Sequence, residues 1–180
     1  MKPTFKAQPM QVQVPATSAN LGPGFDCLGL ALNMHDRYMA QVMDESGVDI
    51  DVTGEGADAV PTNDKNLVIK AMYKGFDFLG GRPRGIALRQ LNVIPHGRGL
   101  GSSAAAIVGG LALARALVLG GNERMSHEDM LNIANEMEGH PDNVAAAING
   151  SANIAWQESH RGNVVAQSLR IDVDPRIGAL

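Results

Sequence analysis

The chain has 180 residues, 44% hydrophobic and 19% charged, a composition typical of a globular protein with its own core. Its formal net charge of −4 gives no electrostatic footprint for nucleic-acid binding. A single cysteine, Cys27, excludes an intramolecular disulfide and favours a reducing compartment. The N-terminal residues lack the apolar core of a secretory signal, and the uncharged run 99–114 is shorter than the roughly 20 residues of a membrane span. We therefore expect a cytoplasmic protein without nucleic-acid or membrane partners.

The first half of the chain predicts strands and one helix. Segments with alternating or apolar strand patterns are 11–15, 37–43, 48–53 and 84–94. Residues 16–26 are crowded with turn-forming side chains, and an apolar run follows at 27–34. Asn63 or Asp64 is expected to cap a helix over 65–79.

The second half predicts mainly helices. A long helix is expected over 102–119, ended by Gly120 and Gly121. Ser126, followed by Asp129, predicts the start of another helix that ends near Gly139. Pro141 can open a short helix, since proline is tolerated in a first turn. Two final strands are expected over 151–156 and 164–173. Without regular alternation of strands and helices, the class is α+β.

The end of the sequence has no feature that marks a natural terminus. From Asp174 to Leu180 a further apolar strand begins. We expect the chain to be a piece of a longer protein.

The segment PHGRGLGSSAAA, residues 95–106, has the ingredients of an anion-binding loop. Its glycines let backbone N–H groups approach a ligand, and its serines lie where a helix begins. A helix N-terminus offers unpaired donors and partial positive charge, which suits a phosphate. Neither a Walker A motif nor a dinucleotide fingerprint is present. The residues alone leave open a plain strand-to-helix turn with a capping serine.

Three strings resemble known kinases. The pattern P-x-x-x-G-L-G-S-S-A-A at 95–105 resembles the second motif of the GHMP kinases (galacto-, homoserine, mevalonate and phosphomevalonate kinases). Residues 14–32 look like the first motif of homoserine kinases. The string EGHPDNVAA at 138–146 resembles a further segment of theirs, with Ala146 where proline is common. The resemblance implies a two-layer GHMP N-terminal domain over 1–180, similar to domain 2 of ribosomal protein S5, with the C-terminal domain absent.

The resemblance also implies how the substrate is held. Asn20 and Asp26 flank a Gly-Pro-Gly turn, and Asp142 and Asn143 follow Pro141. By themselves these residues also suit a supported turn and a helix first turn. The resemblance implies that Asn20, Asp26 and Asp142 contact L-homoserine. Asp142 and Asn143 are then the catalytic pair, with Asn143 supporting the γ-phosphate and the substrate hydroxyl.

A nucleotide site follows from the same resemblance. It implies an ATP site made of Pro95, His96, Gly97, Arg98, Gly99, Leu100, Gly101, Ser102, Ser103, Ala104, Ala105 and Asn66. Asn66 equally suits the first turn of the predicted helix. Mg²⁺ is expected on Glu138 and Ser103 (or Ser102), because this hard cation takes one or two protein oxygens besides phosphate and water.

The implied reaction is transfer of the γ-phosphoryl group of MgATP to the hydroxyl of L-homoserine, in threonine biosynthesis. Such reactions depend mostly on positioning and charge neutralisation. Asp142 can take the hydroxyl proton or only orient the substrate, and His140 is expected to fix its loop. The alternatives are another GHMP kinase of the mevalonate type, a non-catalytic relative, and an inactive fragment. A homodimer is compatible with the sequence.

Overall fold

One sheet organises the computed structural model, which describes residues 2–160, 162–174 and 176. Its strands are β1 (Met10–Ala19), β2 (Leu28–Met43), β3 (Gly47–Gly54), β4 (Gly85–Asn92), β5 (Ala152–His160) and β6 (Asn163–Ile171). The long strand β2 pairs antiparallel with β1 on one side, and with β4 and β5 near its two ends on the other. β3 runs parallel to β4, and β6 runs antiparallel to β5. The sheet order is therefore β3-β4-β2-β5-β6, with β1 beside β2.

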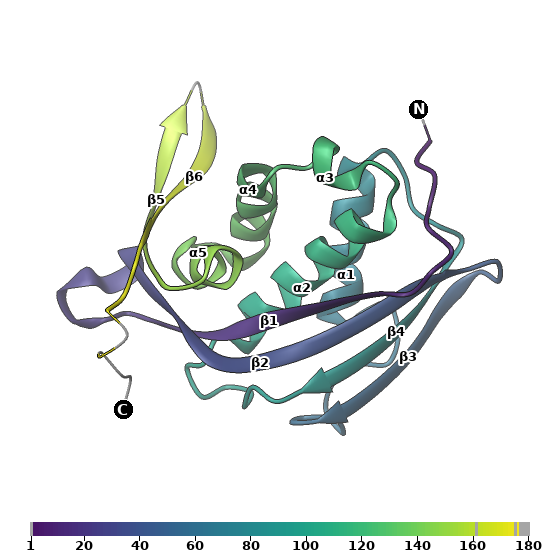
Figure 1. Ribbon diagram of the computed structural model, residues 1–180, viewed down its shortest axis with the longest axis horizontal. Helices are drawn as coiled ribbons and strands as arrows, with labels where there is room; N and C mark the ends of the chain where they lie inside the picture. Colours follow the sequence, from purple (N-terminus) through teal and green to yellow (C-terminus); the bar gives the residue numbers. More distant parts are fainter. Residues whose placement is uncertain (1, 161, 175, 177–180) are drawn as a thin grey trace.

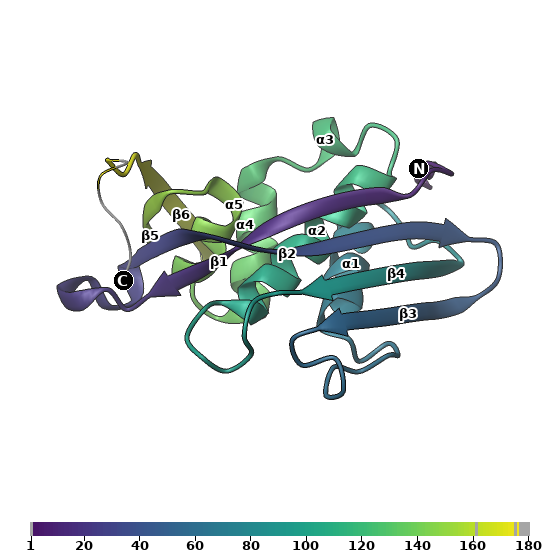
Figure 2. The same ribbon diagram turned by 60° about the horizontal axis from the view of Figure 1, so that its bottom comes forward.

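The helices lie on one face of this sheet, so the molecule has two layers (Figures 1 and 2). They are α1 (Leu67–Phe78), α2 (Ser102–Leu117), α3 (Gly121–Arg124), α4 (His127–Glu138) and α5 (Asp142–Asn149), with a 3₁₀ helix η1 (Gly22–Cys27) between β1 and β2. α2 is the central helix and is buried along most of its length. A Cβ on Gly110 would lie 2.4 Å from the carbonyl oxygen of Val68, so this glycine lets α1 and α2 approach closely.

The predicted α+β class is confirmed, and most predicted strands and helices are present with shifted ends. The turn expected over 16–26 is wrong for its first part, because β1 continues to Ala19. Ala16 and Thr17 are fully buried, and the Thr17 N–H donates to the carbonyl oxygen of Leu100 at 3.0 Å. Burial and pairing with β2 thus outweigh turn propensity. The run 27–34 and the predicted strand 37–43 form the single strand β2.

Two helix ends also differ from prediction. α1 is capped by Asn66 rather than by Asn63 or Asp64. α2 ends at Leu117, because the following residues are extended and pair with the N-terminal segment, where the Leu119 N–H donates to the Thr4 carbonyl at 2.9 Å. Gly121, expected to end α2, instead begins the short helix α3.

The strand expected from Asp174 onward lies mostly outside the described residues. Within the described ranges, no helix combines the length and the apolar composition needed to cross a bilayer.

Candidate functional site

The glycine-rich segment connects β4 to α2. Gly97, Gly99 and Gly101 all have left-handed φ angles, of 66°, 71° and 66°. Gly101 is the N-cap of α2 and provides no side-chain cap. A Cβ at Gly101 would lie 2.0 Å from the Thr17 hydroxyl oxygen, so β1 fixes the position of the loop's end. The first turn of α2 therefore offers unpaired backbone donors to an anion.

A buried carboxylate anchors the other end of this segment. Asp36 on β2 is 1% exposed, and its Oδ1 accepts hydrogen bonds from the Val93 and Ile94 N–H groups at 2.6 and 2.9 Å. Its Oδ2 accepts from the Tyr38 hydroxyl at 2.8 Å. Burial, with Asp36 beside it, raises the pKa of the Tyr38 hydroxyl above its ordinary value, so the phenol stays a neutral donor. Asp36 thus fixes the two residues that directly precede Pro95, where the loop starts.

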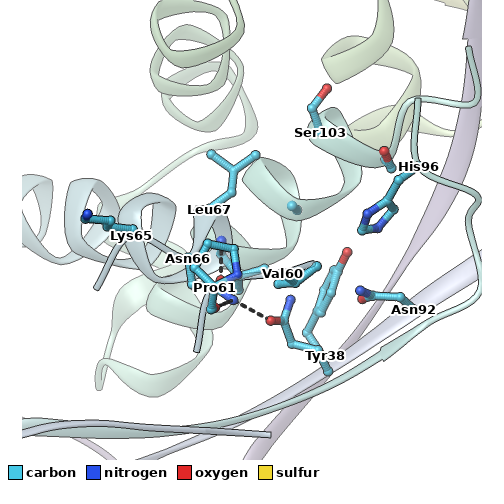
Figure 3. A pocket seen from close by; sticks show the side chains of 13 residues that line it. Tyr38, Val60, Pro61, Lys65, Asn66, Leu67, Asn92, His96 and Ser103 are labelled. Atoms are coloured by element: carbon cyan, nitrogen blue, oxygen red, sulfur yellow. Dashed lines mark hydrogen bonds between the residues drawn. The ribbon is translucent and has the colours of Figure 1, made fainter. Parts of the chain in front are cut away.

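A cavity of about 260 Å³ opens between α1, β4 and the start of α2 (Figure 3). Tyr38, Asn92 and His96 lie together on one side of it, and Val60 and Pro61 lie near Asn66. Asn66 is fully buried, and its side chain is already occupied. Its Oδ1 caps α1, while its Nδ2 donates to the Pro61 carbonyl at 2.9 Å and to the Gln90 Oε1 at 2.7 Å. Asn66 shapes this cavity more than it offers free groups to a ligand.

A second cleft of about 430 Å³ lies on the other side of the α2 N-terminus. Its lining includes Asn20, Gly99, Gly101, Ser103, Glu138 and Asn143. The Ser103 hydroxyl donates to Glu138 Oε1 at 2.6 Å, which places two oxygen ligands side by side. Ser102 and Ser103 line both the cavity and the cleft, so the two hollows meet at the first turn of α2.

Asn20 and Asn143 bring amide groups to this cleft from different parts of the chain. The Thr17 hydroxyl donates to Asn143 Oδ1 at 2.8 Å, which orients the Asn143 amide. Asn20 has a φ of 56°, a left-handed conformation that asparagine tolerates better than most residues. Backbone outliers of this kind cluster at functional sites.

Two predicted acidic residues, Asp26 and Asp142, are not among the residues that line this cleft. Asp142 is 1% exposed, and its Oδ1 contacts His140 Nδ1 and accepts from the Asn143 N–H, both at 2.7 Å. Asp26 lies exposed in η1, next to Phe25 with its φ of 41°. Both carboxylates are described by the structure, and neither lines the cleft. The structure therefore brings Asn20, Asn143, Ser103 and Glu138 together at this cleft, and the substrate contact of Asp26 stays a prediction.

The remaining predicted loop residues have distinct surroundings. His96 lines the cavity, Leu100 lines the cleft, and Pro95 is half-buried before the loop. Arg98 is exposed. Ala104 and Ala105 are fully buried in the first turn of α2, where small side chains let the helix start lie against its neighbours.

Asp36, Tyr38 and Thr17 were not predicted from the sequence. A weak signal was present, because Asp36 and Tyr38 share one face of a strand with Ala40, which is buried. An acidic residue at such an inward position needs hydrogen-bond donors. The sequence gives no indication that these donors come from residues 93 and 94.

Comparisons with known proteins agree with this arrangement. Residues 66–151 match the GHMP kinases N terminal domain. These residues belong to a GHMP kinase N-terminal domain. The chain is 51% identical over 157 residues to a homoserine kinase of Streptomyces coelicolor, covering 87% of this chain and 50% of that protein. It is 46% identical over 167 residues to a homoserine kinase of Mycobacterium tuberculosis, covering 91% and 52%. The resemblance read from the motifs is thereby confirmed.

Solved structures show the same fold. A homoserine kinase from Cytophaga hutchinsonii aligns with a TM-score of 0.72 and 33% identity over 84% of this chain and 49% of that one. A mevalonate kinase from Methanococcus jannaschii aligns with a TM-score of 0.66 at 12% identity, which shows the fold alone. The chain spans about half the length of the curated relatives it matches.

Proposed function

We propose that this chain is the nucleotide-binding part of an ATP-dependent kinase that phosphorylates the hydroxyl of L-homoserine. The observation that carries the proposal is the meeting of two hollows at the uncapped start of α2. The cavity beside Asn66 and Tyr38 suits a nucleoside, and the cleft beside Glu138 suits phosphates and an acceptor. A nucleotide that lies across Ser102 and Ser103 would have its phosphates on free backbone donors.

The chain's own groups would act mainly by positioning. Backbone N–H groups of the loop and of the α2 first turn bind the phosphates. The adjacent oxygens of Ser103 and Glu138 fit Mg²⁺, which accepts a small number of protein oxygens and completes its shell with phosphate and water. When bound, this ion neutralises charge on the transferred phosphoryl group. Binding at this point requires the Ser103–Glu138 hydrogen bond to open.

The acceptor hydroxyl is proposed to lie near Asn143 and Asn20. Asn143 is held by Thr17 and by the first turn of α5, so its amide has a fixed direction. We propose that Asp142 orients this group, because its buried carboxylate is already engaged by His140 and by the Asn143 N–H. A strong base is not required for a loose phosphoryl-transfer transition state.

The choice of L-homoserine rests on the first motif and on the relatives named homoserine kinase. A mevalonate-type substrate is the competing assignment, supported by the shared fold alone. A cytoplasmic location and a single domain over 1–180 stay predictions.

The test is calorimetric titration of this chain with a nonhydrolysable MgATP analogue, followed by L-homoserine or mevalonate. We expect nucleotide binding that L-homoserine strengthens and mevalonate does not. Glu138→Gln should weaken binding in the presence of Mg²⁺ and change it little in EDTA. A mevalonate response would overturn the substrate assignment. A folded chain that binds no nucleotide, in this length and in an extended one, would overturn the proposed site.

A further inference from the structure

A separate cavity of about 350 Å³ lies toward the opposite end of α2. Arg115, which lines it, is about 20 Å along the helix axis from Ser102 at the nucleotide site, given the rise of about 1.5 Å per residue. Elements β1, α2, α4 and α5 contribute its apolar wall: Val12, Val14, Val108, Ala112, Met130 and Ile148. Within the described ranges, no aspartate or glutamate lines it.

Arg115 lies between this apolar wall and the polar lining residues Gln13, Asn122 and His127, and its guanidinium is poorly satisfied. Its Nε is buried and has no hydrogen-bond partner among the residues that the structure describes. Its Nη1 lies 3.7 Å from the Met130 sulfur, and its Nη2 lies 3.4 Å from the Asn122 carbonyl oxygen, so both contacts are weak. A buried unsatisfied donor costs about 1–3 kcal/mol, more beside a charge.

Other arginines of the described chain are accommodated differently. Arg82 and Arg89 are paired with Asp77 and Asp49 at 2.5 and 2.9 Å. Arg37 has no carboxylate partner among the described residues, but it is exposed and therefore hydrated. Arg115 is part-buried, and no described carboxylate lies within 4.0 Å of it.

Helix electrostatics account for only part of this placement. A cation in the last turn of α2 is favoured by the helix dipole. That preference is met equally well by an extended, hydrated side chain. It does not explain an arginine that lines a partly apolar cavity and whose buried Nε–H has no acceptor in the described part of the chain.

We propose that this cavity binds a small aliphatic carboxylate. The carboxylate would accept from the Arg115 guanidinium, whose planar fork matches two oxygens at once. Because the Nη contacts are weak, the guanidinium can turn toward the ligand. One carboxylate oxygen would then accept from the Nε–H. The branched aliphatic body would pack against Val12, Val108 and Met130. His127 and Asn122, exposed at the rim, add polar groups near the carboxylate.

The test follows the Nε–H signals of the arginines by ¹⁵N NMR during titration with 3-methylbutanoate. The Arg115 signal should move and saturate in the millimolar range, as expected for so small a ligand. The matched uncharged 3-methylbutanamide should produce no such movement. Inorganic phosphate, which lacks the apolar body, should bind at least about tenfold more weakly than 3-methylbutanoate.

Variants separate binding from folding. Arg115→Lys and Arg115→Met should each weaken 3-methylbutanoate binding about tenfold or more, with the amide spectrum otherwise preserved. Arg37→Lys, at an exposed position of β2, should leave binding unchanged. An unmoved Arg115 signal overturns the proposal, and so does equal binding of the amide. Equal binding of phosphate overturns the assigned ligand class. Retained affinity in a folded Arg115→Met variant overturns the role of the guanidinium.

Discussion

At the residue scale, Asp36 fixes the start of the phosphate loop. Asp36→Ala leaves the Ile94 N–H and the Tyr38 hydroxyl buried without their acceptor, and it also removes the acceptor of the part-buried Val93 N–H. We expect a loss of about 3–5 kcal/mol in the free energy of unfolding, measured by urea denaturation. Asp36→Asn keeps one oxygen acceptor, and the Tyr38 hydroxyl can reverse to accept from the amide, so its cost should be about half as large.

The control is Asp49→Ala. Asp49 pairs with Arg89 at 2.9 Å, but its side chain is 59% exposed. Such a surface pair is worth about 0–1 kcal/mol. Equal losses for Asp36→Ala and Asp49→Ala would contradict the anchoring role of Asp36.

Two loop glycines provide a second comparison at this scale. Gly99→Ala introduces a left-handed alanine into open space, where the strain costs about 1–2 kcal/mol. Gly101→Ala has the same strain and also a Cβ at 2.0 Å from the Thr17 hydroxyl oxygen. We expect Gly101→Ala to cost at least about 2 kcal/mol more, and thermal unfolding of the two variants measures the difference. Similar melting temperatures would show that β1 does not constrain the loop.

The sequence revealed the local part of the site and missed its distant contacts. The loop glycines and Ser103 stand within one motif, where spacing and residue type indicate anion binding. The contact between Thr17 and Asn143 spans 126 positions and depends on the packing of α5 against β1. No local pattern encodes such a pairing. Asp26 illustrates the opposite case, since its motif is clear but it is not among the residues that line the cleft, so its contact with a substrate stays a prediction.

At the element scale, two N-caps of unequal burial predict unequal losses. Asn66 caps α1 and also donates to Pro61 and Gln90 inside the protein. Ser126 caps α4 at an exposed position through a capping box with Asp129. Asn66→Ala should cost about 2–4 kcal/mol, because it removes the cap, leaves the buried Gln90 Oε1 without its donor and also removes the donor to the Pro61 carbonyl. Ser126→Ala should cost about 1 kcal/mol.

Urea denaturation of both variants tests this difference, and nucleotide titration adds a second readout. Asn66→Ala should also weaken nucleotide binding, because Asn66 joins α1 to β4 across the cavity. Ser126→Ala should not. The reverse order of stabilities would mean that Asn66 acts as an ordinary surface cap.

The prediction of elements failed where tertiary pairing overrides local preference. Turn-forming residues 16–19 are held in β1 by pairing with β2 and by burial. The early end of α2 depends on the N-terminal segment, whose Lys6 N–H donates to the Leu117 carbonyl at 2.8 Å. Where the signal is local, as in the Ser126 capping box and the Gly139 helix end, the prediction agrees with the structure. The sequence therefore predicts which elements form better than where packing stops them.

At the scale of the whole molecule, β5 and β6 form the least integrated part of the sheet. They rise away from the other strands at one end of the molecule (Figure 1). β5 joins the main sheet through the short pairing of Leu28–Leu30 with 152–154, and β6 pairs with β5 alone among the described strands. Leu169 and Ile171 on β6 are 57% and 42% exposed. Regions with few buried apolar contacts open below the global unfolding free energy.

Native-state hydrogen exchange should therefore separate two parts of the sheet. Amides near Val165 and Ala166 should exchange through openings a few kcal/mol below those of α2 and the centre of β2. The Ala166 N–H donates to Asn132 Oδ1 of α4 at 2.8 Å, which is one tie between β6 and the helical layer. Asn132→Ala should speed exchange in β6 and leave exchange in α2 nearly unchanged. Gln157→Ala, at an exposed position of β5, tests the neighbouring hydrogen bond from Gln157 Nε2 to Asn135 Oδ1. Equal protection of β6 and β2 would show that the strand pair unfolds with the rest of the sheet as one cooperative unit.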